Sequence, residues 1–489
     1  MTKRYLGGYI GSRTYPLPIS GGLRGIQELI TGISGGVWPV AGNWFNISTA
    51  ATFYLECIEL DSAGNIYVCG GDNGTAGAGG IEAILIKFNP AGQILWQVAL
   101  GIATGERFYS CVLSASGSFI YAGGGSTTNN DLMLAKYNVS DGSLVWQQKS
   151  VNTGVDYISS LRALTDGSDG VMASAQYVVG GKQGHAQIKF NSNGTVNVAR
   201  SYYYNTQNAL YYSVALALNG TSQIVSTGRM NQVGASVYGY GIFNANYAMS
   251  DNRVVQWSLN NSNFPQDITI DSAGNAYVVG FNSISSPNTF TATLAKFDCA
   301  TSLNSTLSWQ RPVGVASDIL KNQANCVYLE SNTEIWTGTL NWSDNVGSYL
   351  FVTKVNAAGT IQSSHTITFT DGSNMWVPTR GMIVRGGYLY IIFRKYAKSA
   401  GVAVQRDNTV FGQMITAKFP SNLSSYLGVK GIFTIAVNST ASYPAPATAG
   451  TVTQTTQTGL TTSSAGIIAP TAQTFTASTT NYGNTLTPM

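Results

Sequence analysis

Short apolar runs separated by polar turns that contain glycine recur through the middle of the chain. In the clearest stretch, residues 61–65 read Asp-Ser-Ala-Gly-Asn and residues 66–70 read Ile-Tyr-Val-Cys-Gly. The first five residues favour a tight turn, because Asp bonds its own backbone and Gly and Asn accept positive φ angles. The apolar run after them has strand propensity. Nearly the same phrase returns at residues 271–280, so the pattern predicts a turn feeding a strand at both places.

The neighbouring apolar runs predict a small antiparallel sheet. Strands are expected at residues 54–60, 66–69, 81–88 and 93–98, and glycine-rich turns join each strand to the next. Four short strands in sequence order are typical of a meander.

A second phrase repeats along the chain and sets the period. It begins with a lysine in an apolar strand, followed by an aromatic or apolar residue and then by Asn or a similar residue. A turn with glycine comes next, and the strand after it often contains Trp-Gln. Its lysines are Lys87, Lys136, Lys189, Lys296, Lys354 and Lys418, and a seventh copy at residues 241–244 lacks the lysine. Successive copies lie 49 to 64 residues apart. A repeat of about 40–50 residues with four strands is typical of a β-propeller blade. The sequence therefore predicts an all-β, seven-bladed β-propeller over residues 50–437. The repeated lysines are expected to snorkel or to pair locally, and a ring of them that holds an anion in the channel is the alternative.

Two segments lie outside this repeat. Residues 1–49 are too apolar for a free tail and too short for a domain, so an N-terminal docking arm is expected, with packing against its own propeller as the alternative. Residues 438–489 contain no Lys, Arg, Asp or Glu and cannot bury enough apolar surface to fold alone. We expect an extended C-terminal arm that pairs with a neighbouring subunit, and a disordered tail is the alternative.

Composition narrows the classes of partner. Charged residues make up 10% of the chain, against roughly 25% in ordinary globular proteins. The net charge of +4 and the absence of a basic run argue against nucleic-acid binding. The sequence has no run of about 18 apolar residues, so membrane insertion is not expected. Residues 1–15 do not resemble a secretory signal.

Candidate chemistry is sparse. The five cysteines, Cys57, Cys69, Cys111, Cys299 and Cys326, form no CxxC pair and are expected to be buried free thiols. A disulfide between Cys57 and Cys69, across the first two strands, is the alternative. The two histidines, His185 and His365, belong to different blades and are expected to be structural, so no metal site is predicted.

Catalytic motifs are also lacking. The sequence contains no HExxH, GxSxG or phosphate-binding loop. The carboxylates Asp156, Asp267 and Asp318 could meet at the mouth of the ring, which is the less favoured alternative. The Asp61 and Asp271 turns are attributed to turn bonding and not to calcium. We therefore expect no catalytic residues, no metal and no cofactor.

Two resemblances add to this. The opening Lys3-Arg4-Tyr5-Leu6-Gly7-Gly8, followed by Ser20-Gly21-Gly22-Leu23 and then Trp38-Pro39, resembles the N-terminal segment of virion proteins from tailed bacteriophages. The match covers about 40 residues, and Leu23 stands where that segment more often has Trp or Tyr. The stretches 61–70 and 271–280 resemble bacterial β-propeller repeats built on Asp-Xaa-Xaa-Gly-Asn-Ile-Tyr-Val-Xaa-Gly.

These resemblances imply a function. We expect a structural component of a bacteriophage tail (fibre, nozzle or baseplate-associated) that acts without catalysis, located in the virion. Its expected partners are other tail proteins, further copies of itself in a symmetric oligomer, and a host-surface glycan. The alternative is an extracellular bacterial propeller that binds carbohydrate or mediates adhesion. Residues expected to serve assembly or binding are Trp38, Pro39, Tyr203, Tyr204, Tyr238 and Tyr240, because exposed aromatic side chains are good contact surface. The alternative for the tyrosines is that they are strand residues packed between blades.

Overall fold

The structure is a computed structural model. It describes residues 43–47, 53–73, 81–90, 92–100, 105–126, 132–149, 156–179, 182–204, 211–219, 223–231, 238–246, 252–258, 262–284, 289–299, 306–314, 322–343, 347–369, 374–397, 414–425, 427–430, 433–437, 453–456, 460–463 and 477–478.

The described strands form seven antiparallel sheets, numbered here in chain order. Sheet 1 contains β2 (Phe53–Leu60), β3 (Ile66–Asn73), β4 (Ile81–Phe88) and β5 (Ile94–Leu100). Sheet 2 contains β6 (Glu106–Leu113), β7 (Phe119–Ser126), β8 (Leu132–Asn138) and β9 (Leu144–Lys149). Sheet 3 contains β10 (Tyr157–Ala163), β11 (Val171–Val179), β12 (Lys182–Phe190) and β13 (Val196–Tyr204). Sheet 4 contains β14 (Tyr211–Asn219), β15 (Gln223–Asn231), β16 (Tyr238–Asn246) and β17 (Asn252–Ser258).

The remaining sheets follow the same order. Sheet 5 contains β18 (Ser262–Ile270), β19 (Asn275–Ile284), β20 (Thr289–Asp298) and β21 (Thr306–Pro312). Sheet 6 contains β22 (Asn322–Ser331), β23 (Glu334–Ser343), β24 (Gly347–Asn356) and β25 (Ile361–Phe369). Sheet 7 contains β26 (Asn374–Arg385), β27 (Tyr388–Ala397) and β28 (Met414–Pro420), joined by β1 (Asn43–Ile47).

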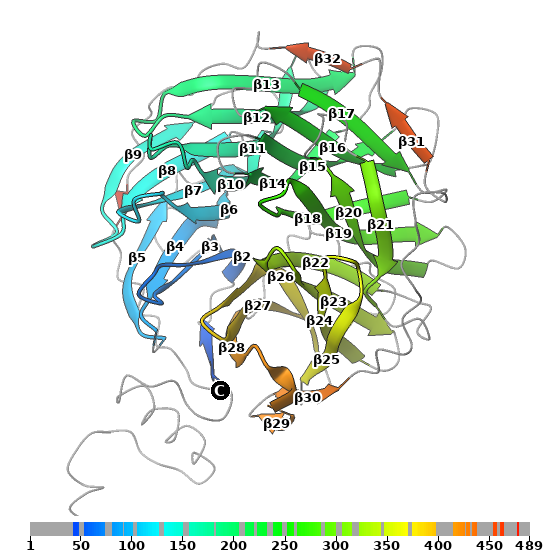
Figure 1. The fold of residues 1–489 in the computed structure, drawn as a ribbon. Helices are drawn as coiled ribbons and strands as arrows, with labels where there is room; N and C mark the ends of the chain where they lie inside the picture. The colour runs from blue at the N-terminus through cyan, green and yellow to red at the C-terminus, as the bar shows by residue number, and fades with distance from the viewer. Residues whose placement is uncertain are drawn as a thin grey trace, which may run out of the picture.

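The sheets stand around a common centre (Figure 1). The first strand of each sheet is innermost, and β2, β6, β10, β14, β18, β22 and β26 each contact the inner strand of the next sheet, with β26 contacting β2. The predicted all-β propeller is confirmed. Among the described residues, no helix is long or apolar enough to span a membrane.

The apolar core lies between adjacent sheets. Between sheets 1 and 2, for example, Tyr67 and Leu85 pack in one cluster with Phe108 and Met133. Because each sheet is covered on both faces, strands such as β4 are buried at almost every position.

The two Asp-Ser-Ala-Gly-Asn turns have the predicted chemistry. Oδ1 of Asp61 accepts the backbone N–H groups of Ala63 and Asn65 at 3.0 and 2.8 Å. Its Oδ2 accepts the Asn65 side-chain amide and the Tyr67 hydroxyl at 2.7 and 2.9 Å. Gly64 takes a φ of 81°. Asp271 repeats these four contacts, so each carboxylate is used by its own turn.

The repeated lysine and tryptophan join neighbouring sheets. Nζ of Lys87 and Nε1 of Trp96 both donate to the carbonyl oxygen of Val139, in the turn of sheet 2. Lys136 and Trp146 make the same contacts with the Ser192 carbonyl in sheet 3, and Lys296 and Trp309 with the Ala357 carbonyl in sheet 6. The same three lysines also lie over the rings of Tyr67, Tyr121 and Tyr277 in their own sheets. The expected local pairing is therefore present, and the bond to a backbone carbonyl of the following sheet is an additional contact that was not predicted.

The N-terminal side of the chain closes the ring. β1 pairs with β28 from Asn43↔Lys418 to Ile47↔Met414, so it is the outermost strand of sheet 7. β1 lies within the predicted docking arm, residues 1–49, which therefore ends inside the propeller.

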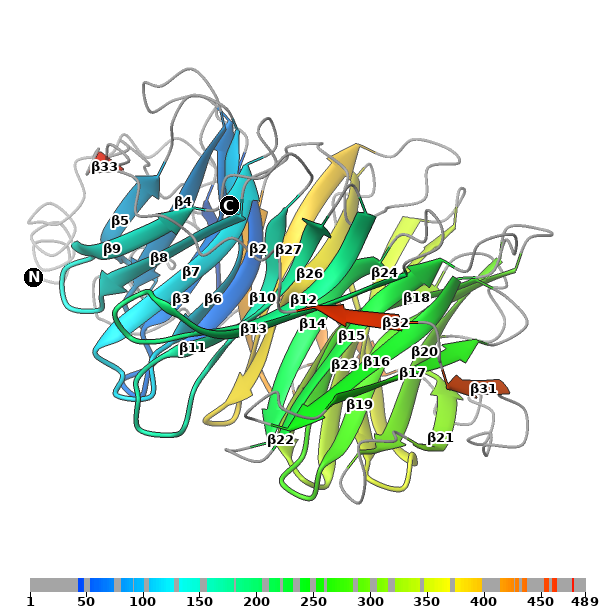
Figure 2. The same cartoon turned by 90° about the horizontal axis from the view of Figure 1, so that it is seen from above.

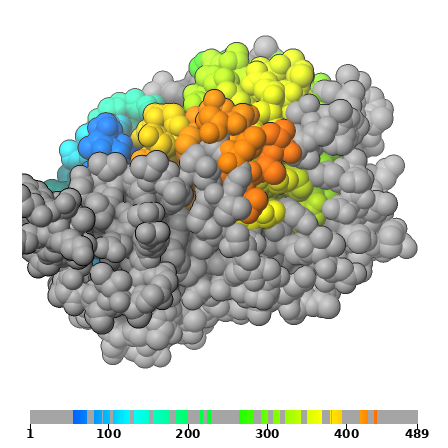
Figure 3. All heavy atoms as spheres, turned by 90° about the horizontal axis from the view of Figure 1, so that it is seen from below, coloured from blue at the N-terminus to red at the C-terminus, as the bar shows by residue number. Residues whose placement is uncertain are grey.

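The C-terminal side adds strands to the outer edges of other sheets. β29 (Gly428–Lys430) and β30 (Phe433–Val437) extend sheet 6 beyond β25. The 3₁₀ turn η1 (Leu423–Ser425) precedes them. The described residues of η1 and β30, drawn orange in Figure 3, lie beside yellow residues of sheets 6 and 7.

Three further strands lie in the predicted C-terminal arm, residues 438–489. β31 (Thr453–Thr456) pairs with β17, β32 (Leu460–Ser463) with β13, and β33 (Ala477–Ser478) with β5. Figure 2 shows β31 and β32 along the outside of the ring. These pairings are made with the chain's own sheets. The physical reason is that an outer strand presents unpaired backbone N–H and C=O groups, and a Thr- and Ser-rich extended segment can pair with them.

Candidate functional site in the central cavity

A cavity of about 240 Å³ lies where the inner strands face one another. Residues from β2, β6, β10, β18, β22 and β26 line it, including Cys57, Glu59, Cys111, Arg162, Asp267 and Arg385. Propellers place such a space on the ring axis because their inner strands cannot fill it completely. The cavity therefore brings charged and thiol groups from five of these sheets to one place.

Most polar groups of this cavity are held by backbone contacts. Oδ1 of Asp267 accepts the N–H of Ile268 at 2.9 Å, and its Oδ2 accepts the N–H of Val327 in sheet 6 at 3.0 Å. Arg162 donates from Nη1 to the carbonyl of Leu161 at 2.7 Å. These contacts fix the orientation of the carboxylate and the guanidinium.

The two other carboxylates that were considered for the mouth of the ring, Asp156 and Asp318, are not found beside Asp267 among the described residues. Asp156 is buried directly before β10 but does not line this cavity, and Asp318 lies outside the described residues. The predicted meeting of the three carboxylates is therefore not seen in the described part of the chain.

Glu59 is the acidic group whose ionisation is most affected. Burial raises the pKa of its carboxyl to about 7, opposed by its hydrogen bond with the N–H of Leu60 and by the nearby Arg385 and Arg162 guanidinium groups. The carboxyl can therefore gain or lose a proton near neutral pH.

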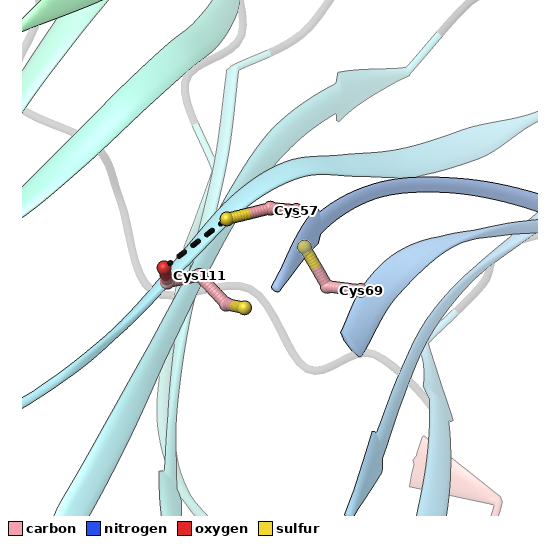
Figure 4. A group of neighbouring side chains, drawn as sticks. All are labelled: Cys57, Cys69 and Cys111. Atoms are coloured by element: carbon pink, nitrogen blue, oxygen red, sulfur yellow. Dashed lines mark hydrogen bonds between the residues drawn. The ribbon is translucent and has the colours of Figure 1, made fainter. Parts of the chain in front are cut away.

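Three thiols converge at the edge of the cavity. The Sγ atoms of Cys57, Cys69 and Cys111 all lie within 4.8 Å of one another. Figure 4 shows the three side chains close together, with a dashed line from the Cys57 sulfur to the Cys111 carbonyl oxygen. All five cysteines are thiols outside any disulfide, and the expected burial is confirmed for four of them, with Cys57 partly exposed. The expectation that no metal-ligand set converges is wrong for these three residues.

Strand register explains the convergence. Cys57 and Cys69 are directly opposite each other on β2 and β3. β2 has a bulge between Leu55 and Cys57, and β6 has one between Phe108 and Ser110. Cys57 is thus the first residue after its bulge, whereas Cys111 is the second residue after its own. Because successive side chains point to opposite faces of a strand, Cys57 and Cys111 turn toward each other between sheets 1 and 2.

The three thiols differ in acidity. Hydrogen bonds with the Cys111 and Cys69 thiols, together with a bond to the Cys111 carbonyl at 3.5 Å and the charge of Arg162, lower the pKa of Cys57. Hydrogen bonds with Cys57 and Cys69, and burial, raise the pKa of Cys111. Burial raises the pKa of Cys69. Cys57 is therefore the first of the three to become a thiolate.

Sequence reasoning found two of these three residues and missed the third. The cross-strand position of Cys57 and Cys69 follows from the predicted hairpin. Cys111 belongs to the next sheet, and only an alignment of the two bulges would have placed it nearby.

The residues predicted for assembly or binding lie elsewhere. Trp38 and Pro39 are outside the described residues. Tyr203 and Tyr204 lie on β13, opposite Thr461 and Leu460 of β32. Tyr238 and Tyr240 lie on β16, opposite Asn231 and Arg229 of β15. The tyrosines therefore belong to two neighbouring sheets near the outer side of the ring and not to the cavity.

Each of the two histidines contacts a serine hydroxyl. Nε2 of His185 lies 2.8 Å from Oγ of Ser226, between sheets 3 and 4. Nε2 of His365 lies 3.0 Å from Oγ of Ser424. Burial lowers the pKa of both imidazoles, that of His185 to about 3.

Comparison with known proteins gives only distant similarity. No family model matches the chain, and no curated protein matches it. Among solved structures, the phage phi92 endosialidase is 11% identical with a TM-score of 0.41, over 78% of this chain and 69% of that one. A polysaccharide lyase that acts on ulvan is 9% identical with a TM-score of 0.46, over 71% and 94%. The β-propeller domain of the Trilobed protease from Pyrococcus furiosus is 8% identical with a TM-score of 0.42, over 76% and 96%. No activity of these proteins is carried over to this chain.

Proposed function

We propose that the protein is a structural component of a bacteriophage tail that acts without catalysis, with the propeller as a rigid body in the virion. Its partners are other tail proteins and further copies of the same chain in a symmetric oligomer. The aromatic positions Tyr203, Tyr204, Tyr238 and Tyr240 are assigned to contact with a host-surface glycan.

The observation that carries this proposal is the position of β1. The preceding segment, which resembles the N-terminal segment of tailed-phage virion proteins, is joined directly to the outermost strand of sheet 7. A segment that leaves a ring at its outer edge can reach a neighbouring protein without disturbing the core. Trp38 and Pro39, four to five residues before β1, are assigned to that attachment.

The C-terminal strands have a different role in this proposal. Because β31, β32 and β33 pair with sheets of the same chain, they stiffen the outer side of the ring. Attachment to neighbours is therefore assigned to the N-terminal segment.

Mass spectrometry of purified phage particles tests the proposal. The protein should be present with other tail proteins, and deletion of residues 1–39, which spares β1, should prevent incorporation. A matched control is deletion of residues 479–489, which follow β33, and this variant should still be incorporated. Circular dichroism should show the same strand signal in both variants.

Other results would overturn the proposal. A protein absent from particles, or incorporated equally without residues 1–39, would contradict it. A monomer in the extracellular fraction that binds polysaccharide would favour the carbohydrate-binding propeller instead, and release of reducing ends from host polysaccharide would show an enzyme.

A further inference from the structure

We propose that Cys57, Cys69 and Cys111 form a binding site for a thiophilic metal ion, with Zn²⁺ as the ion that the ligands favour. This site is independent of the proposed virion role, and either can fail without the other. It would lie at the edge of the central cavity and join sheet 1 to sheet 2.

The spacing of the sulfur atoms suits such an ion. A zinc–thiolate bond is about 2.3 Å long, so tetrahedral geometry places thiolate sulfurs about 3.8 Å apart. The three Sγ atoms are already within 4.8 Å of one another, and a contraction of about 1 Å would complete the set. Cys57 and Cys69 already lie opposite each other on β2 and β3. Rotation of the side chains can therefore supply the remaining movement without a shift of the strands.

The surroundings leave a place for one more ligand. Cys57 and Cys111 line the cavity, whereas Cys69 lies behind them. Three protein ligands with an open fourth position are the arrangement that lets zinc hold a water molecule. The cavity volume of about 240 Å³ is sufficient for such a water.

Charge is also accounted for. On binding, each thiol gives its proton to solvent, and three thiolates with one divalent cation carry a net charge of −1. Arg162 lines the same cavity and its positive charge opposes that residual negative charge. Soft thiolate ligands select zinc and monovalent copper over magnesium or calcium.

The competing arrangement is a disulfide between Cys57 and Cys69. Their direct pairing across two antiparallel strands brings these two cysteines together, but a disulfide gives Cys111 no part. Metal binding that requires Cys111 therefore distinguishes a metal site from a Cys57–Cys69 disulfide.

Titration of the reduced full-length protein with Cd²⁺ tests the site, because cadmium–thiolate bonds absorb in the ultraviolet in proportion to the number of thiolates. Wild-type protein should bind one ion with the intensity of three thiolates. Each of Cys57→Ala, Cys69→Ala and Cys111→Ala should lose about a third of that intensity or weaken binding at least tenfold. Cys299→Ala and Cys326→Ala remove buried thiols from sheets 5 and 6 and should leave it unchanged.

A second measurement does not depend on variants. X-ray absorption at the zinc edge of wild-type protein loaded with Zn²⁺ should show three sulfur ligands. Two or fewer sulfurs, equal binding by the Cys57→Ala/Cys69→Ala/Cys111→Ala triple variant, or a Cys57–Cys69 disulfide that persists in mild reductant would each overturn the proposal.

Discussion

Trp96 of sheet 1 donates its indole N–H to the backbone carbonyl of Val139 in sheet 2, 3.1 Å away. Lys87 donates to the same oxygen at 2.9 Å. The carbonyl follows Asn138, and the corresponding carbonyls of Ser192 and Ala357 follow Asn191 and Asn356. The repeated sequence phrase is therefore a contact between consecutive sheets, in which one copy supplies the donors and the next copy supplies the acceptor.

Substitutions at Trp96 should separate the hydrogen bond from the packing. Trp96→Phe keeps most of the buried ring and should lower the free energy of unfolding by about 1 kcal/mol. Trp96→Ala also leaves a cavity and should cost about 3–5 kcal/mol. Urea denaturation followed by tryptophan fluorescence and circular dichroism measures both. Leu95→Ala on the same strand, where the side chain is 52% exposed, should change little, and an equal loss there would contradict this assignment.

Gly142 should not tolerate a side chain. Its φ is 75°, and a Cβ atom would lie 2.8 Å from the Trp96 ring. Gly117 has a φ of 70° with nothing within 4 Å of its Cβ position. Gly117→Ala should therefore cost only the backbone strain, about 1–2 kcal/mol, and Gly142→Ala should cost about 1–3 kcal/mol more. Thermal unfolding of the two variants gives the comparison, and equal losses would show that the tryptophan contact is irrelevant.

Asp61→Ala should destabilise the first turn. The Tyr67 hydroxyl and the Asn65 amide would lose their acceptor, at a cost of about 1–3 kcal/mol. Asp141→Ala removes an exposed turn carboxylate that accepts bonds from Ser143 in its own turn and should cost less. Hydrogen exchange of the strand that begins at Ile66 would localise the effect, and unchanged exchange there would argue against it.

His185 should make stability depend on acid pH. Its folded-state pKa of about 3 lies below the ordinary value of 6.5, so the unfolded state binds more protons between these values. Stability contributed by the neutral imidazole is present above pH 6.5 and is lost as the pH falls toward 3. Urea midpoints measured from pH 7 to 5 should fall less steeply in His185→Gln than in wild type. Parallel curves would contradict the assignment.

Truncation after residue 438 should expose three strand edges. Removal of β31, β32 and β33 uncovers β17, β13 and β5, and unpaired edges promote association. The ring should stay folded because its inner strands and inter-sheet cores are untouched. Sedimentation velocity should show oligomers that grow with concentration, whereas truncation after residue 478 should stay like wild type. A truncated chain whose oligomeric state matched that of wild type at all concentrations would contradict the role of these strands.

Strong local patterns made the blades predictable from the sequence. The expected strand at residues 81–88 matches β4 in full, because turn residues and apolar runs determine a meander locally. β1, β31, β32 and β33 were not predictable as parts of the ring, since edge pairing uses backbone groups and leaves little trace in side-chain pattern. Likewise, the repeat identified Lys87 and Trp96 but not their acceptor, because a carbonyl oxygen is present at every residue.

The pairing of β1 with β28 has a consequence for biosynthesis. Asn43 meets Lys418, which is 375 residues later in the chain. At about 5–20 residues per second, a ribosome needs roughly 20–75 s between making the two strands. During that time β1 has no partner, so a chain that terminates prematurely can never seal its circle, however many complete blades it has already made.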